Sequence, residues 1–209
     1  MIENYRKHPN GLIEQIKKQR FEYGVNYSEK YNEYGEKGKK MSHLRLGHLV
    51  GALGFVPRSI IDIGYGNGDF LEACTSLILD CYGFDVSDYP LPQGVKRVKD
   101  LFSVETTVAV MYDSLEHFDD VYTIRNLKSD YLVVTVPNCH YPSDAWFETW
   151  KHRKPDEHIW HFSSESLSNF LSEIGYQVLQ ITNVEDAIRK PSESQPNTIT
   201  AVCKLSREK

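Results

Sequence analysis

Several features that define other protein classes are absent from this chain. Its 209 residues include only four cysteines and no Cys-x-x-Cys pair, so neither a disulfide framework nor a zinc-ligand spacing is present. No apolar run approaches the roughly 18 residues of a membrane span, and the first residues, MIENYRKHPNG, lack the apolar stretch of a signal peptide. These absences predict a cytoplasmic protein with reduced thiols, no membrane partner and no metal.

Positive charge is also scarce over most of the chain. Residues 43–209 hold 15 Lys and Arg against 23 Asp and Glu, whereas residues 1–42 hold 9 against 6. A domain this acidic is a poor general binder of nucleic acid. Nucleic acid is therefore a possible but not a favoured partner, and it would need a local basic patch such as residues 151–154.

From residue 59 onward, short apolar runs alternate with helical patterns. The apolar runs cover residues 59–63, 81–84, 95–98, 107–111 and 131–136, and the helical patterns cover 69–79, 117–126 and 163–174. This alternation predicts an α/β fold around a mostly parallel sheet. Two further runs, 176–182 and 197–204, predict an antiparallel hairpin at a sheet edge, joined by a surface loop over 185–196.

The first 42 residues predict a helical or lid segment in front of a domain over 43–209. Residues 11–21 carry apolar side chains at helical spacing, and residues 43–53 predict a helix that Gly54 ends. Between them, residues 22–40 are typical of a loop or lid. The tyrosines of this stretch are spaced for packing along a helix or for a lid over a ligand: Tyr23, Tyr27, Tyr31 and Tyr34.

The motif that points to chemistry is IIDIGYGNGDF, residues 60–70, in which an apolar strand runs through Gly64, Gly66 and Gly68 into a helix. Glycines there permit a tight turn and let a ligand lie against bare backbone, while the helix presents free N–H groups. The spacing G-x-G-x-G differs from the dinucleotide fingerprint, and the lysine of a nucleoside-triphosphate loop is missing.

Acidic residues follow the next two predicted strands. Asp85 can accept hydrogen bonds from both hydroxyls of a ribose, and Asp100, followed by Leu101 and Phe102, suits an adenine amino group and ring face. Asp is also common in ordinary turns, so each residue alone has a purely structural explanation. Together with the glycine loop they predict a site for an adenosine-containing cofactor.

These signals, in this order, resemble class I S-adenosylmethionine (SAM)-dependent methyltransferases of the small-molecule branch. The segments DSLEHFDD (113–120), VVTVPN (133–138) and IGYQV (174–178) are also similar to segments of this family. The resemblance covers about residues 43–204. It implies a Rossmann-like fold with a mostly parallel seven-stranded sheet, an antiparallel C-terminal strand and helices on both faces, with SAM as cofactor. It implies these cofactor-binding residues: Asp62, Gly64, Gly66, Gly68, Asp85, Asp100, Leu101 and Asp113. More narrowly, WKHRKPDEHIWHFS (150–163) is similar to uncharacterised methyltransferases of bacteriophages.

Two histidines are candidates for a catalytic base. His117 follows the fourth predicted strand, at the edge of the sheet where ligands of open α/β folds bind, and imidazole titrates near neutral pH. The alternative is helix capping, in which Asp113 or Ser114 caps a helix with Glu116 in its first turn. His158 is the second candidate base.

Residues 138–162 combine aromatic, histidine and basic side chains after the fifth predicted strand, where an acceptor pocket forms. We expect this segment to cap the acceptor, with aromatic faces for stacking and cations for an anionic group. The expected acceptor-binding residues are Trp150, His152, Arg153, Lys154 and Trp160. A metal site is not favoured, because no histidine pair here matches a tight zinc spacing.

The predicted function is methyl transfer from SAM to an oxygen or nitrogen atom of a small, anionic or aromatic acceptor. A nucleic-acid base methyltransferase is the first alternative. Against it, Tyr-Asp-Ser-Leu stands where amino-methylating DNA enzymes resemble one another in an Asn/Asp-Pro-Pro-Tyr/Phe motif, and no Pro-Cys nucleophile occurs. The second alternative is a SAM-binding protein without turnover.

Overall fold

The computed structural model describes residues 2–19, 21, 35–191 and 194–206. The four tyrosines predicted to pack along a helix or to form a lid lie outside these residues, so that prediction stays open. Among the described residues, no helix has the length and apolar character needed to cross a bilayer.

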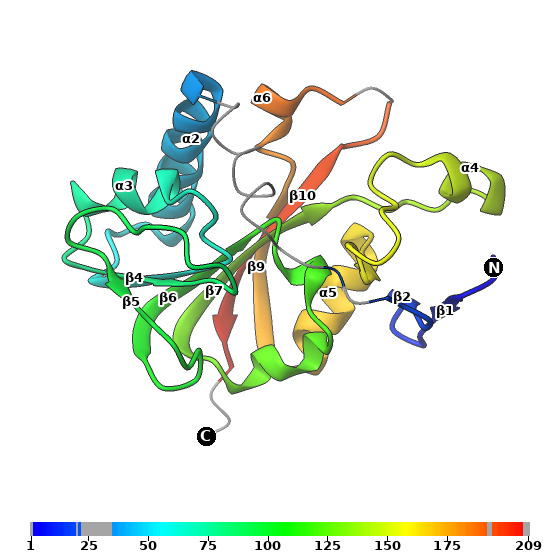
Figure 1. Cartoon of the computed structure of the whole chain (residues 1–209), viewed down its shortest axis with the longest axis horizontal. Coiled ribbons are helices and arrows are strands. Elements are labelled where there is room, and N and C mark those ends of the chain that lie inside the picture. The colour runs from blue at the N-terminus through cyan, green and yellow to red at the C-terminus, as the bar shows by residue number, and fades with distance from the viewer. Residues whose placement is uncertain (1, 20, 22–34, 192–193, 207–209) are drawn as a thin grey trace.

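A seven-stranded sheet forms the centre of the molecule (Figure 1), as predicted. Its strands are β3 (Ser59–Ile63), β4 (Asp80–Phe84), β5 (Lys96–Arg97), β6 (Glu105–Tyr112), β7 (Lys128–Pro137), β9 (Tyr176–Thr182) and β10 (Thr198–Leu205). They are ordered β5-β4-β3-β6-β7-β10-β9. β3 to β7 pair in parallel, whereas β10 runs antiparallel to both of its neighbours. β3, β6 and β7 are almost continuously buried, which is typical of parallel strands covered on both faces.

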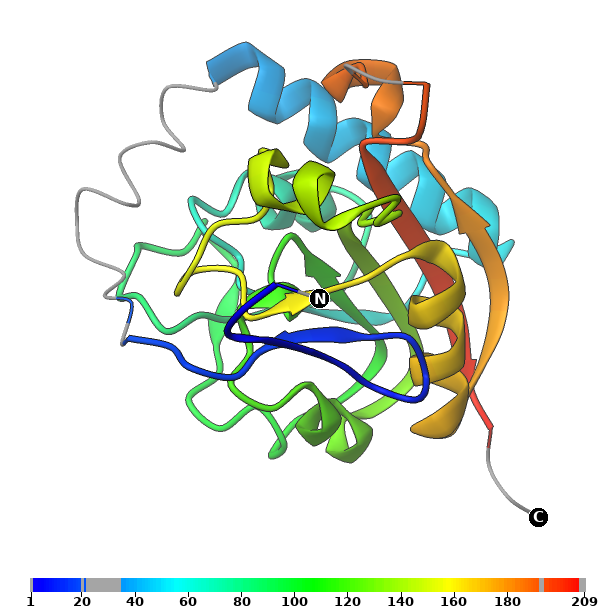
Figure 2. The same cartoon turned by 90° about the vertical axis from the view of Figure 1, so that its right-hand side faces the viewer.

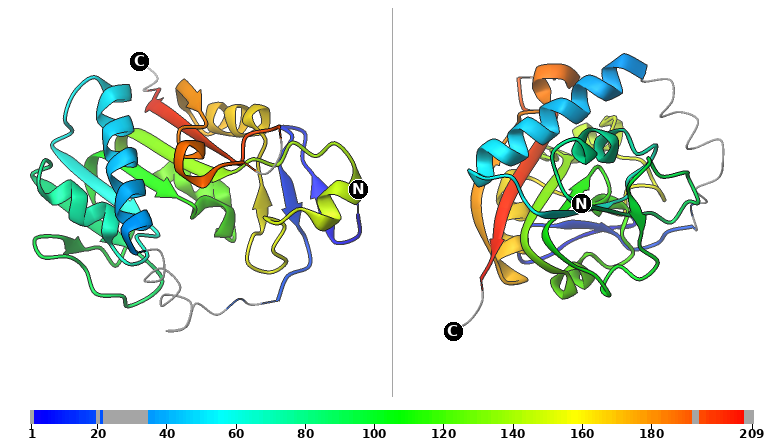
Figure 3. Two further views of the ribbon diagram at one scale, coloured as in Figure 1. Left: turned by 90° about the horizontal axis from the view of Figure 1, so that it is seen from above. Right: turned by 90° about the vertical axis from the view of Figure 1, so that its left-hand side faces the viewer.

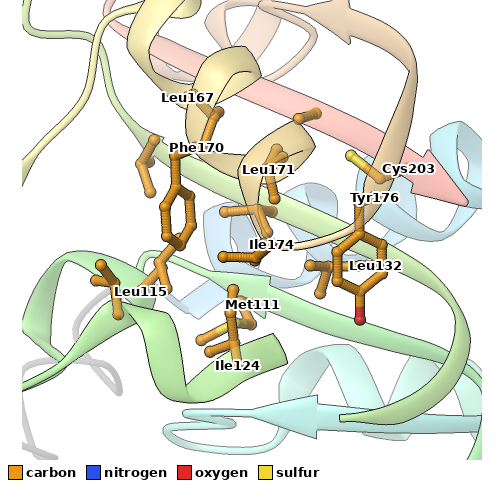
Figure 4. Close-up of a cluster of buried hydrophobic side chains, with 14 of the residues drawn as sticks. Met111, Leu115, Ile124, Leu132, Leu167, Phe170, Leu171, Ile174, Tyr176 and Cys203 are labelled. Carbon is orange, nitrogen blue, oxygen red and sulfur yellow. The ribbon is translucent and has the colours of Figure 1, made fainter. Parts of the chain in front are cut away.

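The helical elements are arranged around the sheet. They are α2 (Gly35–Leu53), α3 (Asp69–Thr75), α4 (Asp144–Thr149), α5 (Ser164–Glu173), α6 (Asp186–Arg189) and the 3₁₀ turns η1 (Leu115–His117) and η2 (Val121–Asn126). Side chains of α2 and α3 pack with Ile60, Val108 and Val110 of the sheet. Side chains of α5 and η2 pack with the alternate strand residues, including Met111 and Leu132, on the opposite face (Figure 4).

Three predicted helices differ from the observed elements. The pattern over 69–79 ends as a helix at Thr75, and the pattern over 117–126 forms 3₁₀ turns rather than an α-helix. The helix predicted over 43–53 begins earlier, at Gly35, and Gly54 follows it with φ 75°, as expected of a helix-ending glycine. The predicted surface loop over 185–196 contains α6, and Glu185 at its start is fully buried.

The N-terminal residues form a second, small sheet instead of the helix predicted over 11–21. β1 (Tyr5–Lys7) and β2 (Ile13–Gln15) pair as a hairpin, and β2 also pairs with β8 (Trp160–His161). Figure 2 shows this hairpin beside β8. The apolar side chains of 11–21 fit the repeat of a helix or that of a strand. The strand forms because β2 pairs with the distant β8, and Leu12 beside it is buried in the main core.

Candidate active site

The glycine loop leaves β3 at the edge of the sheet where the parallel strands end. Gly64, Gly66 and Gly68 have φ values of 80°, 56° and 82°, a left-handed conformation that side chains disfavour. The Gly64 N–H donates to the Phe84 carbonyl at 2.7 Å, and the Gly66 N–H donates to Oδ2 of Asp85 at 3.0 Å. These bonds tie the loop to the end of β4.

Close neighbours also require glycine at two of these positions. A Cβ built on Gly64 would lie 2.6 Å from Cβ of Ser114, and one on Gly68 would lie 2.8 Å from Cδ of Pro92. Ser114 itself is held by a hydrogen bond from its hydroxyl to the Ile63 carbonyl, at 2.6 Å. The loop therefore presents bare backbone, as the sequence predicts.

A cavity of about 1030 Å³ opens beside this loop. Seven of the predicted site residues line it: Gly64, Gly66, Asp85, Asp100, Leu101, Asp113 and His117. Other lining residues are not among the predicted site residues, above all Lys18, Gln19 and Phe21 from the N-terminal segment and Ser114, Phe118 and Thr123 near η1 and η2. Nothing local in the sequence marks Lys18, Gln19 or Phe21, because their position depends on where the N-terminal hairpin packs.

Asp85 and Asp100, the carboxylates predicted to bind the ribose and the adenine, both line the cavity. Asp85 accepts from the backbone N–H groups of Gly66 and Ser87, at 3.0 and 2.8 Å. Oδ1 of Asp100 accepts from the N–H of Phe102 at 3.0 Å. Each side chain is thus oriented by backbone donors at the end of its strand.

Asp62 does not line the cavity. It lies in β3 behind the glycine loop and is only 3% exposed. Burial, and to a smaller extent the nearby Asp85, raise the pKa of Asp62 to about 7, while Arg45 opposes the shift. Asp62 is therefore a buried residue of β3 and not part of the cavity lining.

Asp113 belongs to a cluster of charges that the sequence did not indicate. Its carboxylate accepts from Arg45 at 2.9 Å and from two nitrogens of Arg189, and Arg45 also donates to the buried Glu185 at 2.7 Å. Burial alone would raise the pKa of Asp113, but Arg189 and Arg45 lower it well below its usual value. The cluster joins α2 and α6 to the loop after β6, and Asp113 adopts a left-handed φ of 55° there.

The helix-capping alternative for residues 113–117 is not what the structure shows. η1 is a single 3₁₀ turn whose N-cap residue, Ser114, makes no side-chain capping bond. Nδ1 of His117 bonds to the carbonyl of Glu157 at 2.9 Å, and the His117 and His158 rings meet edge to face with centroids 4.7 Å apart. Glu116 is 1% exposed beside them, and neither of its carboxylate oxygens has a hydrogen-bond partner.

Burial shifts the titration of all three groups towards the neutral form. It lowers the pKa of His117 and lowers that of His158 to about 2, and it raises the pKa of Glu116, with Asp113 adding to that shift. His117 lines the cavity, so a neutral imidazole faces the space where a reaction would occur. His158 does not line the cavity.

The five predicted acceptor-binding side chains do not line the cavity either. Trp150 packs with Tyr5 and Phe147 in a separate cluster, and the Trp160 indole donates to the Phe118 carbonyl at 2.9 Å. The other three predicted residues also contact protein groups. His152 hydrogen-bonds to Asn197, Arg153 lies over the ring of Tyr5, and Lys154 pairs with Glu157. Figures 1 and 3 show α4 near the N-terminal hairpin, at the end of the molecule away from α3. Of residues 138–162, only Asp156 and Ile159 line the cavity.

Sequence comparison finds a match between residues 31–181 and the model of a methyltransferase domain family. A ubiquinone biosynthesis O-methyltransferase from Cupriavidus pinatubonensis is 36% identical over 75 residues, which are 36% of this chain and 28% of that protein. The aligned region therefore spans less than a third of that relative.

Two solved structures have the same fold over most of their length. A plantazolicin methyltransferase, in complex with a substrate analogue and S-adenosylhomocysteine, superposes with a TM-score of 0.60 at 13% identity, covering 88% of this chain and 91% of its own. A 1,6-didemethyltoxoflavin-N1-methyltransferase from Burkholderia thailandensis superposes with a TM-score of 0.60 at 11% identity, covering 98% of this chain and 100% of its own. At these identities the likeness concerns the fold. The match to the family model covers well over half of the chain, and the protein therefore belongs to the methyltransferase domain family, as a class I SAM-dependent methyltransferase.

Proposed function

We propose that this enzyme transfers the methyl group of SAM to an oxygen or nitrogen atom of a small acceptor bound in the cavity beside the glycine loop. The observation that carries the proposal is the arrangement of that cavity. The same cavity is lined by the bare backbone of Gly64 and Gly66, by the carboxylates of Asp85 and Asp100 and by the imidazole of His117. The glycines and carboxylates suit a nucleoside, and the imidazole offers a proton acceptor.

The cofactor fits this arrangement part by part. The methionine portion would lie against the glycine loop, the ribose hydroxyls would donate to Asp85, and the adenine amino group would donate to Asp100 with its ring against Leu101 and Phe102. The sulfonium is already reactive, so the protein mainly has to align the acceptor in line with the methyl–sulfur bond. The acceptor atom forms the new bond to carbon, and the electron pair of the broken bond stays on sulfur.

A small acceptor is favoured over nucleic acid. The domain carries excess negative charge, and the basic side chains of residues 151–154 do not line the cavity. The relatives reported above are, by name, an O-methyltransferase of ubiquinone biosynthesis, an N1-methyltransferase of 1,6-didemethyltoxoflavin and a plantazolicin methyltransferase. His117 accepts the acceptor proton when the acceptor is not already ionised.

A product screen with methyl-labelled SAM tests the activity. The panel contains phenols, hydroxy acids, heteroaromatic amines, nucleotides and DNA, and we expect label transfer to one of the small-molecule classes. Transfer only to DNA would favour the nucleic-acid alternative. Binding of SAM with no transfer to any acceptor would favour a binding protein without turnover.

Substitutions of the two cofactor carboxylates test the site. Losing a charged hydrogen bond costs on the order of 1.5–3 kcal/mol, so Asp85→Ala should weaken SAM binding about tenfold or more by calorimetry. Asp100→Asn keeps the acceptor oxygen for the Phe102 N–H but adds donors, so it should weaken SAM and S-adenosylhomocysteine alike. Asp88→Ala, an exposed neighbour that does not line the cavity, is the matched control. Unchanged affinity in Asp85→Ala would contradict the site.

A further inference from the structure

We propose that Glu116, His117 and His158 bind one divalent transition-metal ion, of the zinc or manganese type, at the wall of the cavity. The carboxylate and the two imidazoles each offer one ligand atom, and these atoms all lie within 4.8 Å of one another. Ligands of one ion with bonds of about 2.1 Å lie roughly 3.4 Å apart, so modest side-chain rotations close the set. One carboxylate with two histidines is a donor set that zinc accepts in proteins.

Glu116 gives the independent reason to expect a ligand. Its side chain is almost fully buried, yet neither carboxylate oxygen has a hydrogen-bond partner. A buried carboxylate in this state is costly unless a cation or donor compensates it. A metal ion would supply that compensation, because it replaces the missing partners of both oxygens.

The backbone holds the three ligands in place from two distant segments. The Ile159 N–H donates to the Glu116 carbonyl at 2.8 Å, which fixes residues 157–159 against η1. Nδ1 of His117 bonds to the Glu157 carbonyl at 2.9 Å, so the ring proton is on Nδ1 and Nε2 carries a lone pair. Histidines that ligate metals commonly donate their other ring nitrogen to a carbonyl in this way.

The position of the site suggests its role, which rests on the proposed function. His117 lines the cavity, so an ion bound there would face the acceptor. With the ion bound, Nε2 of His117 would be a metal ligand and not the base, and coordination of an acceptor hydroxyl would lower the pKa of that hydroxyl instead. Its proton would leave to solvent, and the oxygen would take the methyl group as the carbon–sulfur bond breaks. The inferred substrate class is therefore a hydroxyl-bearing acceptor.

Metal binding is tested on the full chain after chelator treatment. Zinc chloride and manganese chloride are titrated by calorimetry, and the metal content is measured after gel filtration. We expect one equivalent per chain, and a dissociation constant weakened on the order of 100-fold in Glu116→Gln and in His158→Gln. His161→Gln, buried nearby but outside the cluster, and His43→Gln, exposed on α2, should bind like the wild type.

Two further measurements separate the outcomes. S-adenosylhomocysteine affinity should be unchanged in Glu116→Gln and His158→Gln, since neither residue lines the cavity, and this shows that both variants are folded. Cobalt substitution should give visible absorption bands that Glu116→Gln alters. No stoichiometric binding by the wild type, or equal affinity in Glu116→Gln, would overturn the metal site and leave the SAM assignment standing. If the metal-loaded wild type does not bind SAM, the proposed function would instead be overturned.

Discussion

At the scale of single residues, Gly64 is constrained twice, by its left-handed φ and by the 2.6 Å approach of Ser114. We predict that Gly64→Ala destabilises the protein beyond the roughly 1–2 kcal/mol of backbone strain, because the added methyl group also displaces Ser114. Gly94→Ala is the matched control, since Gly94 has a φ of 85° but no atom within 4 Å of an added Cβ. Urea unfolding of the two variants measures the difference.

A double-mutant cycle checks the cause of that loss. Ser114→Gly removes the atoms that clash with the new methyl group, so Gly64→Ala should cost less in that background. S-adenosylhomocysteine affinity should fall in Gly64→Ala and remain unchanged in Gly94→Ala. Equal destabilisation by the two alanine variants would show that the contact with Ser114 is unimportant.

The buried side chain of His161 makes the free energy of unfolding depend on pH. It packs against Tyr5 and Phe147, and burial, with Arg153 adding to the effect, lowers its pKa to about 3. Between pH 3 and pH 6.5 the unfolded chain binds a proton at His161 that the folded chain does not, so folding stability falls as the pH falls through this window. His161→Phe keeps a ring in the cluster and should lose about 1–2 kcal/mol less between pH 6.5 and pH 5. Urea unfolding at both pH values measures this, and equal losses in the two proteins would contradict it.

At the scale of elements, the ion cluster around Asp113 fastens α2 and α6 to the end of β6. Removing one arginine leaves charged partners partly buried, so Arg189→Gln should lower the free energy of unfolding at pH 7 by about 1.5–3 kcal/mol. Because the folded pKa of Asp113 is lowered, this contribution is complete above the usual value of 3.8 and diminishes as the pH falls below it. Arg58→Gln, at an exposed position, is the control. A deficit that persists unchanged at low pH would rule out the charge interaction as its cause.

At the scale of the whole molecule, ligand binding should stabilise the fold by mass action. S-adenosylhomocysteine at 100 times its dissociation constant adds about 2.7 kcal/mol, which raises the melting temperature of a domain of this size by roughly 5–10 °C. Calorimetric scans at several ligand concentrations measure the shift. Asp85→Ala, at the same ligand concentrations, should show a much smaller one, and equal shifts would place the ligand elsewhere.

The sequence alone determined the central sheet and the glycine and carboxylate residues that line the cavity, Gly64, Gly66, Asp85 and Asp100. Both depend on local patterns: each apolar run forms one strand, and glycine favours the left-handed φ that Gly64, Gly66 and Gly68 adopt. Asp85 and Asp100 could be predicted to lie together because parallel strands end at one edge of the sheet. Even the antiparallel position of residues 197–204 followed from a pair of adjacent runs.

Only the tertiary structure decided which other side chains reach the cavity. Residues 13–15 form strand β2, which pairs with β1 and with β8, a partner far along the chain, and Lys18 and Phe21 after this strand line the cavity. The aromatic segment 138–162 was expected to face the acceptor, yet Trp150 and Trp160 are buried in packing contacts. Glu116, His117 and His158 lie together where backbone and side-chain hydrogen bonds join η1 to residues 157–159, a segment far along the chain. Composition shows which side chains can bind a ligand, but long-range pairing determines which of them face it.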